Sequence, residues 1–255
     1  MLVTFGQLVL APLLLWQGRR VRRQALRLPE ARGPRSGSVG QGPVRLRLLI
    51  VGDSSGAGVG VDTQAQALSG QLAQALAQRL GGQVQWQLLA RSGQTSAAAL
   101  SQLQASAILP ADVAVTALGV NDVSAGVAPR RWLAQQAQLH ALLSQRAGVR
   151  YTVHSAVPPL HRFAMLPQPL RWWMGARARR LNAALARALA HPEQAGQRGL
   201  LTPPGDWQQP VQVSGAGLLA ADGFHPSASG YALWAQALAE HIAAWLERPG
   251  AQPRT

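Results

Sequence analysis

The sequence predicts an α/β protein, built as a three-layer α/β/α sandwich around a mostly parallel sheet. From residue 44 onward, short apolar segments typical of strands alternate with longer segments whose apolar residues recur at helical spacing. The connections between these segments are short, and repeated strand–helix–strand units give parallel strands with helices on both faces of the sheet. At 255 residues, the chain is long enough for one domain of about 200 residues and a further segment.

Each element of this alternation follows from a local pattern. The first strand, at 44–51 (VRLRLLIV), starts with alternating residues and ends continuously apolar, as expected for a strand buried on both faces. The first helix, at 63–80, carries leucine and alanine at helical spacing and ends at two glycines. The same patterns predict strands at 83–90, 112–119 and 149–157, and helices at 96–106, 129–148, 171–190 and 227–248.

Residues 1–43 are expected to lie outside this domain, which occupies 44–248 and is followed by a tail at 249–255. Residues 2–16 form an apolar stretch, an arginine cluster follows up to Arg27, and a linker rich in Pro, Gly, Ser and Arg leads to the domain.

The apolar stretch and its arginines, residues 2–27, predict contact with a membrane surface. Positive charge follows the apolar stretch, the reverse of the order in a secretory signal peptide. As a helix, the stretch spans roughly 22 Å, less than the hydrocarbon core of roughly 30 Å. We therefore expect a segment that dips into or marginally spans the inner membrane, with its arginines holding the domain on the cytoplasmic side. The alternative is a helix packed on the domain of a cytoplasmic protein, with the arginines as its solvated face.

Composition excludes several classes of site. The chain has no cysteine, so disulfides, thiolate nucleophiles and cysteine-based metal centres are excluded. All 24 basic residues are arginine, and the net charge of +14 is densest at the start, where residues 1–47 hold nine arginines and a single acid, Glu30. No recognition module accompanies the charge, so nucleic acid is not an expected partner.

The turn Gly52–Gly56 (GDSSG), directly after the first strand, fits two nucleophile motifs. Ser54 is the central serine of a G-x-S-x-G nucleophile elbow and also of a G-D-S motif at the end of a first strand. The turn is not a phosphate-binding loop, because the chain has no lysine. Taken alone, a Gly-Ser-rich sequence is more typical of a structural turn than of a catalytic serine.

Three other turns strengthen the catalytic interpretation. Gly93 follows the second strand (ARSGQTS), and Asn121 follows the third (LGVNDVSAG). Asp222 and His225 lie three residues apart before the last helix (ADGFHPSASGY). In a parallel sheet the carboxyl ends of the strands share one edge, where ligands bind. We therefore expect these turns to gather there around Ser54.

In this order, the Ser, Gly, Asn and His of these turns resemble the four blocks of the GDSL, or SGNH, hydrolase family. The resemblance extends over almost the whole predicted domain and implies a flavodoxin-like SGNH hydrolase fold with serine esterase or lysophospholipase-like activity. It implies no cofactor and no metal. Ser54 follows the first strand, and Asp222 and His225 share one turn, so this family fits better than the α/β-hydrolases, whose acid and histidine lie on separate loops.

The resemblance also implies a role for each residue. Ser54 is the nucleophile, His225 its general base, and Asp222 the acceptor that fixes the imidazole tautomer. The oxyanion hole consists of the backbone N–H groups of Ser54 and Gly93 and the side-chain amide of Asn121. Considered without the other motifs, Gly93 could be an ordinary loop glycine and Asn121 could belong to an Asx turn.

Several neighbouring residues are not expected to take part in the chemistry. Ser55 adjoins the nucleophile, and its side chain should point elsewhere. Asp53 and Asp122 are interpreted as groups that order their loops. His154, within a strand, is expected to be a core histidine.

The segment at 157–180 follows the fourth strand and should border the site. We expect it to line an acyl or alcohol pocket or to meet lipid, although its tryptophans and methionines fit a helix core equally well. The candidate pocket residues are Phe163, Met165, Leu166 and Trp172.

These patterns predict a hydrolase of carboxylic esters, with small acyl esters or lysophospholipid-like lipids as substrates. A carbohydrate O-acetylesterase is an alternative that the same residues could serve. An alternative of another class is a catalytically inactive module that binds a membrane or nucleic acid.

Overall fold

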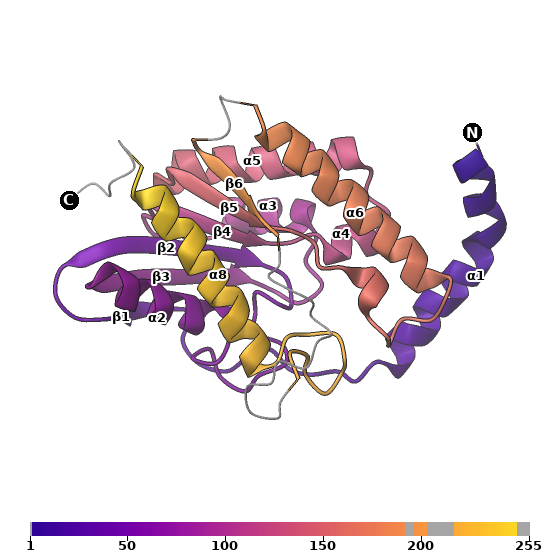
Figure 1. The fold of residues 1–255 in the computed structure, drawn as a ribbon, viewed down its shortest axis with the longest axis horizontal. Coiled ribbons are helices and arrows are strands. Elements are labelled where there is room, and N and C mark those ends of the chain that lie inside the picture. Colours follow the sequence, from indigo (N-terminus) through magenta and orange to yellow (C-terminus); the bar gives the residue numbers. More distant parts are fainter. Residues whose placement is uncertain (1, 192–195, 203–216, 249–255) are drawn as a thin grey trace.

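The computed structural model describes residues 2–191, 196–202 and 217–248 (Figure 1). The predicted three-layer α/β/α sandwich is confirmed: within the described residues a six-stranded sheet lies between two layers of helices. The strand order is β1-β3-β2-β4-β5-β6, and all neighbours are parallel except the edge strand β1, which is antiparallel to β3. The strands are β1 (Ser36–Val39), β2 (Val44–Gly52), β3 (Gln83–Ala90), β4 (Val113–Ala117), β5 (Tyr151–Ser155) and β6 (Arg198–Leu201).

Helices cover both faces of this sheet (Figure 1). One face carries α2 (Leu68–Leu80) and α8 (Ala228–Leu246), and the other carries α3 (Ser96–Ala105), α5 (Pro129–Ala147) and α6 (Leu170–Leu189). The short elements α4 (Val120–Ser124) and η1 (Leu160–Arg162) precede α5 and α6.

The packing of strand β2 explains why the second half of its sequence is continuously apolar. Leu48 and Ile50 pack in the core with α2 and α8, whereas Leu49 and Val51 pack in the core with α3 and α5. Successive side chains of a strand point to opposite faces, so a strand covered on both faces is apolar at every position.

The strand register brings the predicted turns to one edge. At the carboxyl end of β2, Gly52 pairs with Ala90 of β3 on one side and with Ala117 of β4 on the other. The turns that follow these three strands therefore start side by side.

The structure adds elements that the sequence patterns do not predict. Ser36–Val39, expected in a linker, is the edge strand β1, and Arg198–Leu201 is the edge strand β6. Strand β1 is mostly exposed and has no apolar alternation, so it carries no strand pattern. The helix expected at 63–80 begins only at Leu68, because residues 63–67 form a turn around Gln64.

Helix α1 (Leu2–Gln24) contains both the apolar stretch and most of the arginine cluster. It packs on the domain near the start of α6. Leu14 is buried in the α6 core, and the Gln17 amide donates to Gln168 O (2.7 Å) and accepts from Leu170 N (3.1 Å). This contact matches the alternative of a packed helix for one face of α1. No helix in the described part of the chain is long and apolar enough to cross a membrane.

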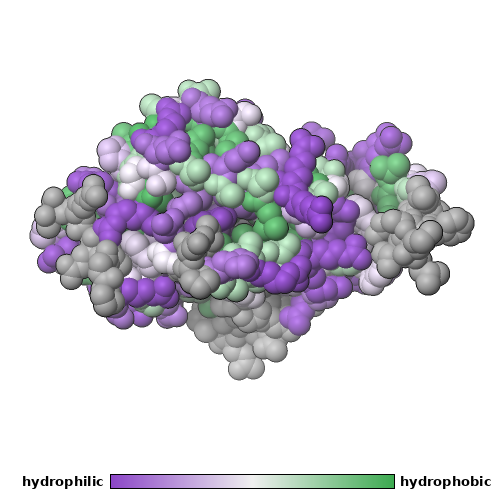
Figure 2. Space-filling model, turned by 90° about the horizontal axis from the view of Figure 1, so that it is seen from above, coloured by the Kyte–Doolittle hydropathy of each residue, from purple (hydrophilic) through white to green (hydrophobic). Residues whose placement is uncertain are grey.

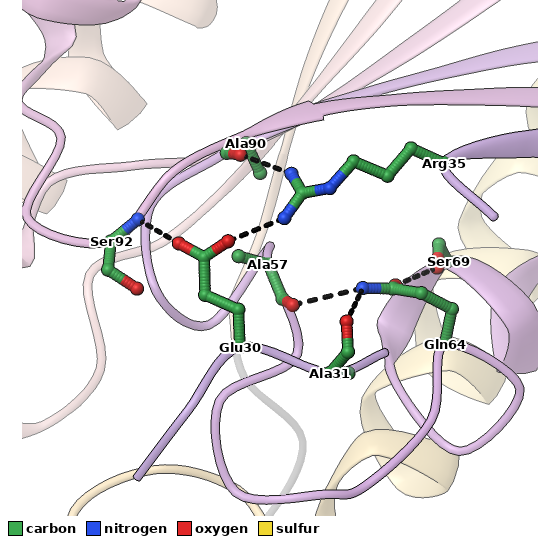
Figure 3. Close-up of polar contacts among 8 residues, drawn as sticks. All are labelled: Glu30, Ala31, Arg35, Ala57, Gln64, Ser69, Ala90 and Ser92. Atoms are coloured by element: carbon green, nitrogen blue, oxygen red, sulfur yellow. Dashed lines mark hydrogen bonds and ion pairs between the residues drawn. The ribbon is translucent and has the colours of Figure 1, made fainter. Parts of the chain in front are cut away.

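Gln64 fastens the segment before β1 to the loop that follows Ser54 (Figure 3). Its buried amide nitrogen donates to Ala31 O (3.0 Å) and Ala57 O (3.1 Å), and its oxygen accepts from the Ser69 hydroxyl (2.8 Å). Every polar atom of this side chain is thus paired inside the fold.

Replacing Gln64 by leucine is expected to lower the free energy of unfolding by ~1–3 kcal/mol, because the Ser69 hydroxyl and the two carbonyl groups lose a buried partner. Urea denaturation would measure the change. Gln74→Leu, at an exposed position of α2, is the matched control and should change stability little. Equal effects of the two substitutions would contradict a structural role for the Gln64 amide.

Candidate active site

Ser54 lies in a tight turn at the end of β2. The turn is closed by hydrogen bonds from Ala57 N to Asp53 O (2.9 Å) and from Val59 N to Ser54 O (3.0 Å). It is tied to α8 by the Tyr231 hydroxyl, which donates to Val59 O (2.8 Å). The serine is therefore fixed both to the centre of the sheet and to the last helix.

Asp222 and His225 lie on a second turn, directly before α8. The Asp222 carboxylate accepts the backbone N–H groups of Phe224 (2.9 Å) and His225 (3.0 Å), and Ser227 caps α8 by accepting from Gly230 N (3.2 Å). The two side chains are thus held in place by the turn that starts the helix.

The structure brings Ser54, His225 and Asp222 into one hydrogen-bonded chain. Ser54 Oγ lies 2.9 Å from His225 Nε2, and His225 Nδ1 lies 2.6 Å from Asp222 Oδ2. With the proton on Nδ1, the ring donates to Asp222 and accepts from the serine hydroxyl. Such an arrangement allows the imidazole to take the serine proton as Ser54 attacks an electrophile.

Asp222 is held in its ionised form. Burial alone would raise its pKa, but the hydrogen bonds from the His225 ring and from the N–H groups of Phe224 and His225 outweigh burial and lower the pKa below its ordinary value. An ionised Asp222 stabilises the positive imidazolium that forms when His225 accepts a proton.

Gly60 allows the serine turn to approach the histidine turn closely. Its φ of +108° lies in the region that favours glycine. A Cβ at this position would clash with the carbonyl oxygen of Pro226 and lie 3.3 Å from the Cβ of His225.

Gly93 and Asn121 follow the two strands that flank β2. Asn121 lies in α4, and its Nδ2 donates to Gln94 O (3.0 Å) and lies 3.4 Å from Asp53 Oδ2. These contacts join the three turns that carry Ser54, Gly93 and Asn121. Gly93 has φ +79°, and no atom of the described residues beyond its two chain neighbours lies within 4 Å of the position that a Cβ would take.

Asp122 and Asp53 order the loops around the site. Asp122 is fully buried and accepts from the backbone N–H (3.1 Å) and the hydroxyl (2.9 Å) of Ser96, which ties α4 to the start of α3. Asp53 accepts from Ser55 N (3.0 Å). Burial, aided by repulsion from Asp122, raises the pKa of Asp53 to about 7 despite this hydrogen bond and the nearby His225.

Glu30 is a residue of the site region that the motif analysis did not select. Its carboxylate accepts from Ser92 N (2.7 Å), directly before Gly93, and pairs with Arg35, whose other nitrogen donates to Ala90 O (Figure 3). The segment before β1 thereby holds the turn that contains Gly93. Its sequence signal is compositional, because Glu30 is the single acid among nine arginines in residues 1–47.

A cavity of about 60 Å³ lies beside the serine turn. It is lined mainly by apolar side chains, among them Leu118, Phe163, Phe224 and Trp234. The Phe163 ring packs 5.3 Å from that of Phe224, which in turn meets the His225 ring edge-on at 5.2 Å.

Of the four predicted pocket residues, Phe163 alone lines this cavity. Met165 is half-buried near Gly223 of the histidine turn. Leu166 instead points into the core beneath α6, where it packs with Leu170, and Trp172 is 53% exposed on the outer side of α6. The apolar character of these last two residues therefore reflects core packing in one case and a surface position in the other.

His154 occupies the core position expected from its strand. Its Nε2 accepts from Arg198 Nε (3.1 Å), and its Nδ1 lies 2.8 Å from the Thr116 hydroxyl. Burial and the Arg198 charge hold the pKa of His154 well below its ordinary value. Among the described residues, no group of three His, Asp or Glu side chains is placed to hold a metal ion.

Comparisons with known proteins agree with this geometry. Residues 50–233 match the model of the GDSL-like Lipase/Acylhydrolase family. The chain is 31% identical over 203 residues to the GDSL-like esterase Rv1075c of Mycobacterium tuberculosis, a match that covers 77% of this chain and 61% of that protein's length.

Solved structures share the fold at low sequence identity. The crystal structure of TesA aligns with a TM-score of 0.54 and 23% identity, over 79% of this chain and 98% of TesA. A carbohydrate esterase family 2 enzyme with a carbohydrate binding domain, from Corynascus thermopiles (Myceliophthora fergusii), aligns with a TM-score of 0.58 and 16% identity, over 82% of this chain and 69% of that one.

Glu30→Ala is expected to slow the labelling of Ser54 by a fluorophosphonate probe about tenfold, because the turn with Gly93, the predicted oxyanion-hole glycine, loses its anchor at Ser92 N–H. Mass spectrometry of the labelled protein would give the rate. Glu240→Ala, an exposed acid on α8, should label at the wild-type rate. An unchanged rate in Glu30→Ala would show that the turn keeps its shape without the carboxylate.

Burial of Asp53 predicts a pH-dependent stability. The pKa is raised in the folded state, so the free energy of unfolding is highest when the carboxyl is protonated and falls as the pH rises toward and through about 7. Asp53→Asn removes this loss. Relative to wild type, its stability should increase by on the order of 2 kcal/mol between pH 5 and pH 8, measured by urea denaturation. Asp62→Asn, at an exposed position, is the control, and a pH-independent difference between Asp53→Asn and wild type would refute the raised pKa.

Proposed function

The chain belongs to the GDSL-like lipase/acylhydrolase family, and we propose that it hydrolyses carboxylic esters of short acyl groups through an acyl-serine intermediate. The observation that supports this proposal most directly is the hydrogen-bonded chain from Ser54 through His225 to Asp222. A module that only binds has no use for this arrangement, in which the serine is paired with a base and the base with an ionised carboxylate.

In the first half of the reaction, Ser54 Oγ attacks the ester carbonyl carbon and His225 Nε2 takes the hydroxyl proton. The negative charge that develops on the carbonyl oxygen is stabilised by the Ser54 and Gly93 N–H groups and the Asn121 amide. When the tetrahedral intermediate collapses, the bond to the alcohol oxygen breaks and His225 gives the proton to the departing alcohol.

In the second half, water replaces the alcohol. His225 takes a proton from the water as its oxygen attacks the acyl carbon. The acid product leaves as the proton returns to Ser54 Oγ, which restores the starting state. Asp222 stays ionised throughout and orients the ring in both halves.

The apolar cavity, which is lined by the residues on either side of Ser54 (Asp53 and Ser55) and of His225 (Phe224 and Pro226), supports a short acyl group. At about 60 Å³, the cavity is small compared with the roughly 300–1,000 Å³ of sites that hold drug-sized ligands. Its size therefore favours acetyl to butyryl groups over a long acyl chain.

A second candidate is removal of acetyl groups from carbohydrates. The size of the cavity favours it, because an acetyl group fits whatever alcohol it is attached to. A carbohydrate esterase family 2 enzyme shares the fold, at 16% identity. Lysophospholipid-like esters, expected from the sequence, require their acyl chain to lie outside the cavity.

Hydrolysis of p-nitrophenyl esters from acetate to laurate tests both the reaction and the acyl length. Ser54→Ala should lower kcat by at least about 10⁴-fold, whereas Ser55→Ala, which leaves the triad in place, should keep most of the activity. We expect kcat/KM to be highest from acetate to butyrate and to fall for octanoate and laurate.

Three results would overturn these assignments. Normal turnover by Ser54→Ala would exclude Ser54 as the nucleophile. A maximum of kcat/KM at laurate would exclude the cavity as the acyl pocket. Strong preference for acetylated oligosaccharides over p-nitrophenyl acetate would favour the carbohydrate esterase over the simple ester hydrolase.

A further inference from the structure

Helix α1 presents an apolar face to solvent. Its inner face is fixed to the domain by Leu14 and Gln17, so the side chains between and beside them point outward. Leu13, Leu15 and Trp16 are 40%, 61% and 55% exposed. Figure 1 shows α1 at the edge of the molecule, with its N-terminal half reaching beyond the start of α6, and Figure 2 shows a small hydrophobic area next to the grey atoms at this edge. Neighbouring exposed apolar side chains of this size mark an interaction surface.

One to two turns further along, the outward face becomes entirely basic. Arg19, Arg20, Arg22 and Arg23 are all exposed, and among the described residues none of them pairs with a carboxylate. The Arg20 guanidinium lies over the Trp16 ring, 5.4 Å from its centroid. This cation–π contact joins the apolar and basic parts into one surface.

The charge of this surface identifies the kind of partner. Protein interfaces place few charged residues at their core. A cluster of arginines that has no carboxylate partner among the described residues, next to exposed apolar side chains, favours a partner rich in negative charge. A second copy of the chain, with a net charge of +14 and only ten acids, does not supply it. An anionic bilayer does, because its acyl region takes apolar side chains and its phosphates take arginines.

We propose that this face of α1 docks the protein on an anionic lipid bilayer. The apolar and basic parts are separated along the helix axis, about 10 Å apart at 1.5 Å per residue. Apolar faces of membrane-bound helices are buried roughly 5–10 Å into the boundary between headgroups and acyl chains, so a helix of this kind can place its apolar part at that depth while its basic part stays near the surface. The helix therefore enters obliquely, with Leu13, Leu15 and Trp16 below the headgroups and the arginines level with the phosphates.

Vesicle sedimentation with the full chain tests the proposal without relying on its enzymatic activity. The vesicles contain phosphatidylglycerol and phosphatidylcholine in about equal amounts, or phosphatidylcholine alone. The wild-type protein should bind the anionic vesicles and lose this binding as salt is added. Binding should fall about tenfold or more in Leu15→Ser/Trp16→Ser and in Arg22→Gln/Arg23→Gln.

Matched controls distinguish docking through α1 from non-specific hydrophobic or electrostatic binding to the vesicles. Leu109→Ser removes an apolar side chain that is 52% exposed elsewhere, and Arg130→Gln/Arg131→Gln removes two exposed arginines on α5. Both should bind as the wild type does, and thermal melting checks that every variant is folded. The proposal is overturned if the wild type does not sediment with anionic vesicles or if the controls lose as much binding as the α1 variants. It is also overturned if light scattering shows a dimer that Leu15→Ser/Trp16→Ser abolishes.

Discussion

The hydrogen bond between Ser54 and His225 joins residues 171 positions apart, and the surrounding structure serves to hold its two ends. One end is set by β2, whose last residue is paired on both sides within the sheet. The other end is set by the turn that caps α8. Tyr231 connects the two, since it belongs to α8 and donates to the loop after Ser54. A small shift of α8 against the sheet would therefore separate His225 from Ser54.

The parts of the fold that the sequence predicts are those with a local cause. Leu48 and Leu49 face opposite cores, so the apolar run of β2 identifies a central strand. Asp222 and His225 meet within one turn, so their spacing alone makes the contact plausible. By contrast, β1 depends on pairing with β3, and Leu166 and Phe163 are three residues apart with equally apolar side chains. Only the packing of the chain decides that one faces the core and the other lines the cavity.

Buried carboxyl groups surround the site, and each is stabilised in a different way. Asp222 accepts enough hydrogen bonds to stay ionised. Asp53 accepts from Ser55 N–H at 3.0 Å and faces Asn121 Nδ2 at 3.4 Å, and its pKa is raised. Asp122 is intermediate: it accepts hydrogen bonds from both the N–H and the hydroxyl of Ser96, but burial still raises its pKa. The carboxylate with the lowered pKa, Asp222, thus lies beside the His225 ring, and Asp53 and Asp122 join loops.

The segment before β2 connects the outer surface of the protein to its catalytic edge. Gln17 fastens α1 to Gln168 and Leu170, in the region that follows Phe163 of the cavity. Thirteen residues later in the chain, Glu30 fastens the same segment to the turn that contains Gly93. Both attachments are made by side chains with more than one hydrogen bond, which resist rotation better than a single contact. If α1 docks on a surface as proposed, these attachments fix the orientation of the cavity and of the turn with Gly93 together. The direction from which the proposed ester substrate would reach Ser54 then follows from how the helix is docked.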